Sequence, residues 1–391
     1  MPVVPMLTGA ISDQDVLQNQ RKPDMDPDIG QIDDDESVLA GLLMRIKTMA
    51  AISSKVEWLE DEPHPRYTNA SASFTNVAGS FTVAAGTGAY FKAGDIIRDE
   101  LTGENMLVTS VATDTLSVTR GFGSVVGTAS SGAADGIVRV AMAATQGATI
   151  PTLIQTKKVA QFNYTQIIRT AAGFTNTSAA SSWFGQDAVV DYEIGKKTVE
   201  HRREIENMLF LGRRNLVVGP PVRSACGGLT DFITTNITTI GGNLTQVNLE
   251  NFLRQAGRFR GNGDVRIAFA APVFLSGMGS FPLGRLAPPD INVDTWGVGA
   301  IQSYRAGSGL NVNIVEKRDW DDFSKTSPAL GGSLVVCCMN ALRLRPLRKT
   351  ALLRNRQGTN EDSVYFEYLT EASLEIKHER KFAVLRGVTG F

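Results

Sequence analysis

Residues 186–211 contain one long helical pattern that is charged along most of its surface, and this constrains the fold more than any other feature. Ten side chains within residues 187–206 are charged. Their four-residue spacing predicts three ion pairs along the helix: Glu193 with Lys197, Lys196 with Glu200, and Arg202 with Glu206. At the usual rise per residue the helix is about 40 Å long. Because its apolar stripe is narrow, we expect it to lie across a surface instead of inside a core, and Gly195 is a point at which it could bend.

The first 36 residues predict an acidic arm, with nine carboxylates and only two basic side chains. Asp33, Asp34 and Asp35 lie close to its end. The arm has no sustained apolar period, so it cannot bury enough surface alone to offset the entropy of ordering it. Fully extended, it would reach about 120 Å, whereas a compact chain of this length has a radius of gyration of about 21 Å. We therefore expect the arm to cross a neighbouring subunit; the alternative is a disordered tail.

A short amphipathic helix is predicted over residues 37–51, where Ser37 can cap the first turn. Its buried face is expected to carry Val38, Leu42, Met44 or Leu43, and Ile46.

Two extended segments, near residues 55–61 and 157–170, flank a β-rich stretch at residues 74–143. The short β-rich runs of this stretch are separated by turn residues, which predicts a small all-β barrel or sandwich. The tight connection at residues 112–114 predicts a β-hairpin. Because the module lies between two extended segments, we expect it to be inserted at the tip of a long β-hairpin.

Residues 213–391 alternate predicted strands and helices, which indicates an α+β body. A helix is expected over residues 246–260, closed by Gly261. The strands of this body are expected at residues 265–274, 310–318, 332–347, 363–369, 372–380 and 382–388.

Composition excludes several classes of protein. The 39 basic and 40 acidic residues give a net charge of −1, which argues against a chain that holds nucleic acid by bulk charge. Three cysteines are too few for a disulfide framework. No apolar run is long enough to cross a bilayer, and the first residues lack the pattern of a secretory signal. We expect a soluble protein of a reducing compartment.

Catalytic and metal-binding motifs are scarce in the sequence. The three histidines, His64, His201 and His378, lie in no metal-ligand spacing. Cys337 and Cys338 are adjacent in an apolar strand, so they point to opposite faces and are expected to be small buried hydrophobes. No glycine-rich fragment completes a nucleotide-binding motif. We therefore predict no enzyme activity, no cofactor and no metal.

A cluster of basic residues lies between positions 343 and 356, a stretch without any acidic residue. Its arginines are Arg343, Arg345, Arg348, Arg354 and Arg356. Three interpretations are open: a solvated strand face, a surface that binds an acidic segment of a neighbouring subunit, or a contact with nucleic acid. The reach of the acidic arm favours the second, so these arginines and Asp33, Asp34 and Asp35 are our candidate inter-subunit residues.

The order of elements, an acidic arm, a β-hairpin with an insertion, a long charged helix and an α+β body, resembles the major capsid proteins of tailed bacteriophages, with the Hong Kong 97-type fold. Three local segments resemble the branch that has a β-domain inserted in its extended loop: VEWLEDE at residues 56–62, LSVTRGFGS at 116–124 and NYTQIIRTA at 163–171. Residues 352–391 are similar to the closing strands of the family. The resemblance covers residues 37–391, with its weakest match at 213–245.

The resemblance implies a domain layout. Residues 1–52 would be the N-terminal arm and short helix, and 53–182 the extended loop with the β-domain inserted at about 74–143. Residues 183–245 would contain the spine helix and part of the peripheral domain, 246–350 the axial domain, and 351–391 the closing strands of the peripheral domain.

The resemblance also implies a function: a virion structural subunit that self-assembles, in the host cytoplasm, into pentamers and hexamers of an icosahedral capsid around double-stranded DNA. DNA would be enclosed without sequence-specific binding, and no membrane would be involved. Expected partners are a separate scaffolding protein, a portal and decoration proteins. The positions of the family's Lys–Asn isopeptide crosslink have no match here, so no crosslink is predicted. The alternatives are a tail-associated or carbohydrate-binding phage protein, and a hydrolase built from scattered carboxylates.

Overall fold

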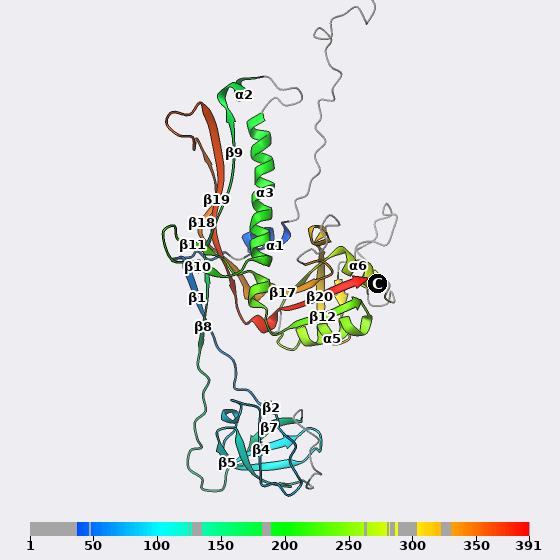
Figure 1. Ribbon diagram of the computed structural model, residues 1–391. Helices are drawn as coiled ribbons and strands as arrows, with labels where there is room; N and C mark the ends of the chain where they lie inside the picture. Colours follow the sequence, from blue (N-terminus) through cyan, green and yellow to red (C-terminus); the bar gives the residue numbers. More distant parts are fainter. Residues whose placement is uncertain are drawn as a thin grey trace, which may run out of the picture. The chain divides into compact units, whose positions relative to one another are not determined.

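The computed structural model describes residues 37–46, 48–124, 126, 135–181, 189–261, 264–279, 281, 286–287, 303–321 and 330–390 (Figure 1). The chain divides into two compact units. One consists of residues 1–58 and 162–391, and the other of residues 59–161. The acidic arm, with Asp33, Asp34 and Asp35, lies outside the described residues.

The first unit contains six described α-helices: α1 (Val38–Ile46), α2 (Asn176–Ala180), α3 (Val189–Leu211), α4 (Leu229–Phe232), α5 (Gln246–Ala256) and α6 (Pro272–Gly279). The chain passes between the units through β1 (Lys55–Glu60) and β8 (Val159–Tyr164), which pair with each other in a two-stranded sheet. A short hairpin of β10 (Asn215–Val217) and β11 (Arg223–Ala225) follows α3.

The largest described sheet of the first unit is a mixed sheet of seven strands. Its strands, in spatial order, are β12 (Ile237–Asn243), β20 (Ala383–Gly390), β17 (Leu334–Cys338), β13 (Arg266–Ala270), β16 (Asn311–Glu316), β15 (Ser303–Arg305) and β14 (Leu286–Ala287). β17 is buried along its whole length, as expected for a central strand. Its Cys337 and Cys338 are buried free thiols, as the apolar strand pattern predicts.

Helix α5 packs its apolar stripe, Leu249, Phe252, Leu253 and Ala256, into the core beside this sheet. Thr245 caps the helix by accepting a hydrogen bond from the backbone N–H of Asn248. The prediction that the helix continues to residue 260 and is closed by Gly261 is wrong. It ends one turn earlier, because Gly257 is the C-cap and donates its N–H to the carbonyl of Leu253.

The second large layer of this unit is a three-stranded antiparallel sheet of β18 (Leu342–Arg354), β19 (Ser363–Ile376) and β9 (Gln166–Thr175), which lies alongside α3 (Figure 1). The two strands predicted at residues 363–369 and 372–380 are one continuous strand, β19. Thr370 and Glu371, between them, pair with Ile168 and Ile167 of β9, so the ladder has no break.

Two of the described sheets contain strands from more than one of the predicted domains. β20, which was predicted to close the peripheral domain, lies in the same sheet as β13, β16 and β17 of the predicted axial domain. β12, from residues 237–243, lies at one edge of that sheet. β18 crosses the predicted boundary at residues 350 and 351 without interruption.

The long helix predicted over residues 186–211 is confirmed as α3. Its last turns do not lie on a surface, since Ile205, Met208, Leu209 and Phe210 belong to the main core. The predicted pair of Arg202 with Glu206 is also wrong, because Glu206 is buried against other partners. Nearby, Lys197 pairs with Glu200, three residues along the helix.

Helix α1 ends at Ile46, so the prediction of a helix to residue 51 is too long. Its predicted buried face is partly wrong as well. Leu39, Ala40 and Leu43 are buried in the main core, whereas Met44 is exposed. Val38 and Leu42 only pack against the edge of this core.

The second unit is all-β within its described residues. Its six-stranded antiparallel sheet has the order β2 (Tyr67–Asn69), β7 (Gly136–Met142), β4 (Asp95–Asp99), β5 (Asn105–Ala112), β6 (Thr115–Thr119) and β3 (Ser80–Thr82). The hairpin of β5 and β6 confirms the one predicted at residues 112–114. Asp114 holds the neighbouring loop, because its carboxylate accepts hydrogen bonds of 3.0 Å from the N–H groups of Gly86 and Gly88.

The second unit has a core of its own, formed by one cluster of buried side chains: Ala70, Phe74, Phe81, Val83, Phe91, Ile97, Met106, Val108, Leu116, Val118 and Ile137. Across the described ranges of both units, no helix is both long and apolar enough to cross a membrane.

Candidate assembly surface

Three glutamates follow one face of β19 at four-residue intervals: Glu367, Glu371 and Glu375. Residues separated by an even number point to the same side of a strand. As whole residues they are 3%, 8% and 1% exposed, in that order. Buried carboxylates require cationic or hydrogen-bonding partners, and the neighbouring strands provide them.

Arginines from β9 and from the loop after β18 bind the first of these carboxylates. Arg169 of β9 donates to Glu367 through Nε at 2.8 Å, and Arg356 donates to the other carboxylate oxygen at 3.0 Å. The hydrogen bond from Arg169 holds the pKa of Glu367 below its ordinary value, so this group remains an anion.

The other two carboxylates are bound mainly from β18. Arg348 donates to Glu371 at 2.6 Å, while Glu375 lies 2.5 Å from Arg345 and 4.0 Å from Arg343. Lys377 adds a further contact with Glu375 at 3.4 Å. Six cationic side chains therefore meet three carboxylates on this face, which leaves an excess of positive charge.

All five arginines predicted to bind a neighbouring subunit thus have a carboxylate partner in their own chain. The pair of Arg354 with Asp191, 4.0 Å apart, differs from the others because both of its side chains are mostly exposed. Exposed pairs of this kind contribute little to stability. The inter-subunit role of the five arginines remains a prediction, and Arg354 is the one least engaged within the chain.

The opposite face of the sheet binds the spine helix α3 through a buried polar cluster. His201 of α3 lies 2.8 Å from the hydroxyl of Thr170 in β9 and 2.7 Å from that of Thr370 in β19. One turn earlier, Thr198 donates to the hydroxyl of Tyr368 at 2.8 Å. Burial lowers the pKa of His201, which favours the neutral imidazole in this cluster.

A buried ion pair connects α3 to the first turn of α1. The carboxylate of Glu206 accepts the backbone N–H groups of Leu39 at 3.1 Å and Ala40 at 2.6 Å. Lys317, at the end of β16, lies 3.4 Å from the same carboxylate and 3.4 Å from that of Asp319. Both members of the pair are only 1% exposed. Burial raises the pKa of Glu206, and the charge of Lys317 and the two N–H groups oppose that shift.

This arrangement fixes the point at which the N-terminal arm joins the body. The first N–H groups of a helix have no partner inside the helix, and they carry partial positive charge. Glu206 satisfies two of them. The sequence contains a hint of this site, because Glu206 is a charged residue among the apolar residues at the end of the helix. Its partners are far away in the chain, so spacing alone does not identify them.

Gly195 lies in the second turn of α3, which continues through it as a regular helix. A Cβ atom at this position would meet no atom within 4 Å. Its role as a hinge is therefore still a prediction.

The residues that the structure describes contain no group of three or more His, Cys, Asp or Glu side chains arranged to hold a metal ion. His64 contacts the backbone carbonyl of Tyr90, and His201 belongs to the cluster between α3 and the sheet.

Comparison with known proteins identifies the chain. The model of the SU10 major capsid protein family matches residues 10–389. No curated protein resembles the chain closely enough to be matched.

Solved structures of low sequence identity are similar in fold. The capsid of a native GTA particle has 9% identity and a TM-score of 0.51, with 98% of this chain and 100% of that chain covered. The capsid of Myoviridae phage XM1 has 10% identity and a TM-score of 0.48, with 97% and 99% covered. A chain of Gordonia phage Cozz has 12% identity and a TM-score of 0.44, with 64% and 78% covered.

The match covers nearly the whole chain, and the described elements follow the order that the sequence predicts. The chain therefore belongs to the SU10 major capsid protein family, and it is a tailed-phage major capsid protein with the α+β, Hong Kong 97-like capsid fold.

Proposed function

We propose that this structural capsid subunit assembles with copies of itself into pentamers and hexamers, and that these close into an icosahedral shell around double-stranded DNA. Closed rings of one subunit need heterologous contacts, in which two different surfaces of the same chain meet. Family membership supports a capsid subunit that associates with itself. Pentamers, hexamers and the enclosed DNA are our extension of that finding.

The observation that carries the proposal is the anchored start of α1. The residues before it form an arm of net charge −7. Glu206 and the main core hold α1 against α3. A force on the arm would therefore be transmitted to α3. A segment that binds a neighbour needs such a fixed base, because ordering a mobile base on binding would cost conformational entropy and weaken the interaction.

We assign the domains as follows. The unit of residues 59–161 is the β-domain inserted in the extended loop, and β1 and β8 are the base of that loop. The seven-stranded sheet is the core of the axial domain, which now includes β12 and β20. The peripheral domain consists of α3 and the sheet of β18, β19 and β9.

We extend the proposal to the partners that the resemblance to the family implies. Assembly occurs in the host cytoplasm with a separate scaffolding protein, a portal and decoration proteins. The chain performs no catalysis, and DNA is enclosed without sequence-specific contacts. Among the predicted inter-subunit residues, we favour a contact between Arg354 of one copy and Asp33, Asp34 and Asp35 of a neighbour. The side chain of Arg354 is 59% exposed, so it is accessible to such a partner.

Electron microscopy of the purified full-length protein tests the proposal. We expect regular shells, or rings of five and six subunits, and we expect truncation of residues 1–36 to reduce their number. Discrete monomers under all assembly conditions would contradict it. A charge-reversal pair tests the contact: Arg354→Glu should impair assembly, and Asp33→Arg with Asp34→Arg should restore it in the same chain.

A further inference from the structure

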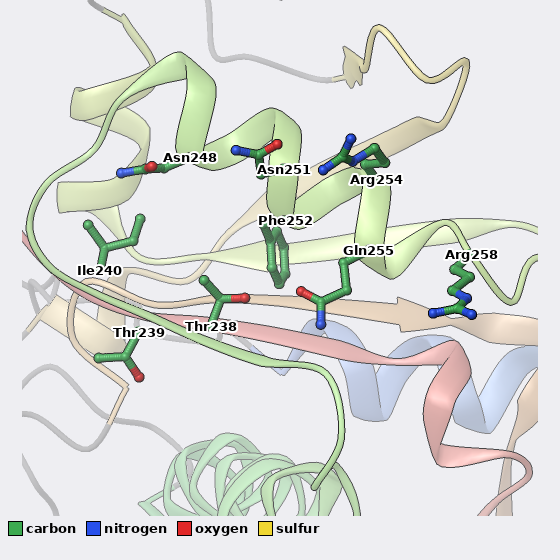
Figure 2. Close-up of a pocket in the computed structure, with 9 residues that line it drawn as sticks. All are labelled: Thr238, Thr239, Ile240, Asn248, Asn251, Phe252, Arg254, Gln255 and Arg258. Carbon is green, nitrogen blue, oxygen red and sulfur yellow. The ribbon is translucent and has the colours of Figure 1, made fainter. Parts of the chain in front are cut away.

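A polar groove runs between the edge strand β12 and helix α5, in the first unit (Figure 2). Its volume is about 720 Å³. Residues 238–240 of β12 form one wall. The other wall is formed by Asn248, Asn251, Arg254 and Gln255 of α5, and by Arg258 just beyond the end of the helix. The side chain of Phe252 lies between the two walls.

The strand wall of the groove has the properties of a template for another strand. Among the strands that the structure describes, β12 pairs only with β20 and lies at one edge of the seven-stranded sheet. The outer N–H and C=O groups of an edge strand are available for an additional strand. A groove bounded by an edge strand and a helix is a common place for an extended peptide to add itself to a sheet.

The helix wall selects for negative charge. Arg254 and Arg258 line the groove, and none of its lining residues is acidic. Within the described part of the chain, neither guanidinium forms an ion pair. Arg386 adds a third cation beside β12, where its Nε donates to the hydroxyl of Thr239 at 3.3 Å. The amides of Asn248, Asn251 and Gln255 can in addition pair with backbone or amide groups.

We propose that this groove binds residues 13–22 of a second copy of the chain, with the acidic side chains Asp13 and Asp15 facing Arg254 and Arg258. This proposal rests on the proposed function, since it requires copies that associate. It extends that function by naming the site that receives the arm.

Two features of the sequence favour this occupant. Residues 13–22, DQDVLQNQRK, contain no proline, so none of the backbone N–H groups that would face β12 is missing. Asp13 and Asp15 would lie on one side of an extended strand, about 7 Å apart. The groove is lined by two arginines and by no acidic residue, so both carboxylates would find a cation there.

The groove is more complementary to a peptide than to packaged DNA. Phosphate binding needs cations alone, whereas this groove offers an unpaired strand edge and three amide side chains next to its arginines. These groups match the backbone and the glutamine-rich and asparagine-rich sequence of residues 14–20. DNA is therefore an alternative that the experiment must separate.

Site-specific photocrosslinking in the full-length protein tests the site. The variant Asn251→p-benzoylphenylalanine places the reactive group in the groove. The control, Val247→p-benzoylphenylalanine, places it on the same helix at a residue that is 68% exposed and does not line the groove. Equal amounts of chains with natural and heavy nitrogen are mixed before assembly, so that mass spectrometry distinguishes crosslinks between copies from crosslinks within one copy.

The expected result is a crosslink from position 251 to residues 13–22 of another copy, absent at position 247. Arg254→Glu with Arg258→Glu should reduce its yield about tenfold, as the loss of two moderately strong ion pairs implies. Asp13→Arg with Asp15→Arg should restore it. The matched arm variant, Asp24→Arg with Asp26→Arg, makes the same charge change elsewhere and should not.

Other outcomes overturn the proposal: a crosslink to another segment, a crosslink within one copy only, a crosslink to nucleic acid, or no crosslink. Shell formation is scored separately by electron microscopy of the same samples. Shells without the crosslink reject the groove and leave the proposed function intact. Crosslinked pairs without shells support the groove and reject the proposed function.

Discussion

The buried pair of Glu206 and Lys317 makes a prediction whose size and pH dependence both follow from the structure. Lys317→Met keeps most of the side-chain volume but removes the charge that lies 3.4 Å from the carboxylate. Glu206 then remains buried with two backbone N–H groups as its partners. Removing one member of a buried ion pair costs about 3–5 kcal/mol, because an uncompensated charge stays behind.

The cost should depend on pH in a defined direction. Burial raises the pKa of Glu206 above its ordinary value of 4.5, and Lys317 opposes that shift. Between the ordinary and the raised value, the folded chain binds more protons than the unfolded chain, so the free energy of unfolding falls as pH rises. Removal of Lys317 raises this pKa further and extends the window upward. We therefore expect Lys317→Met to be much less damaging at about pH 5 than at about pH 8.

The measurement is the free energy of opening of α1, from hydrogen exchange of residues 38–46 in the unassembled subunit at increasing urea concentrations. Lys377→Met is the matched control, since Lys377 is partly exposed and its partner Glu375 keeps Arg345. It should cost less than about 1 kcal/mol. Adding Glu206→Gln to Lys317→Met removes the stranded charge and should recover part of the loss. If the double variant is as unstable as the sum of the two single variants, the reasoning is refuted.

Three further changes test other parts of the fold. Gly195→Ala should stabilise α3 by about 1 kcal/mol, seen as a higher Tm, because alanine is the better helix former and its Cβ has open space; if Gly195 is a hinge, electron microscopy should also show that its shells fail to change size. Arg345→Met should lower the free energy of unfolding by about 1–3 kcal/mol, since it leaves the buried Glu375 with weaker partners, whereas Arg354→Met should cost less than about 1 kcal/mol in the same urea titration. Burial raises the pKa of Cys226 to about 11 and raises that of Cys337 as well, so iodoacetamide should not label these thiols at about pH 8 until the protein is denatured; rapid labelling of the native chain would contradict their burial.

Local patterns in the sequence were sufficient to predict the elements whose structure is determined by residues close together in the chain. The helix α3 is long and strongly patterned, and its existence and approximate bounds were predicted. The hairpin of β5 and β6 has a tight connection and was predicted as well. The buried face of α1 was not predicted correctly, because nine residues define the face of a helix poorly. Its buried side was selected by contact with α3, which lies far away in the sequence.

For the charged residues, too, local spacing predicted the positions within one strand but not the partners on another strand. Arg343 and Arg345 are two residues apart in an extended run, so the sequence placed them on one face. Their partner Glu375 lies on another strand, and spacing within one strand does not identify it. For Arg348 the register is irregular as well, because the pairing of β18 with β19 shifts between Pro346 and Arg348 and between Arg348 and Ala351. Such an irregularity changes which residues face each other, and no local pattern encodes it.

The net charge of the chain is close to zero, but its negative and positive charges are concentrated in different parts of the sequence. This distribution matters more than the total charge for how copies of the chain interact. The chain carries a net charge of −1 and the arm −7, so residues 37–391 carry +6. Within the sheet of β18, β19 and β9, strands fixed beside one another pair most of the arginines with glutamates of the same chain. Positive charge without such a partner is found at the boundary of the body, where Arg254 and Arg258 line the groove beside the edge strand β12. In the function proposed above, the acidic arm of one copy completes this surface on a neighbour, so composition alone is a poor guide to how copies of this chain attract each other.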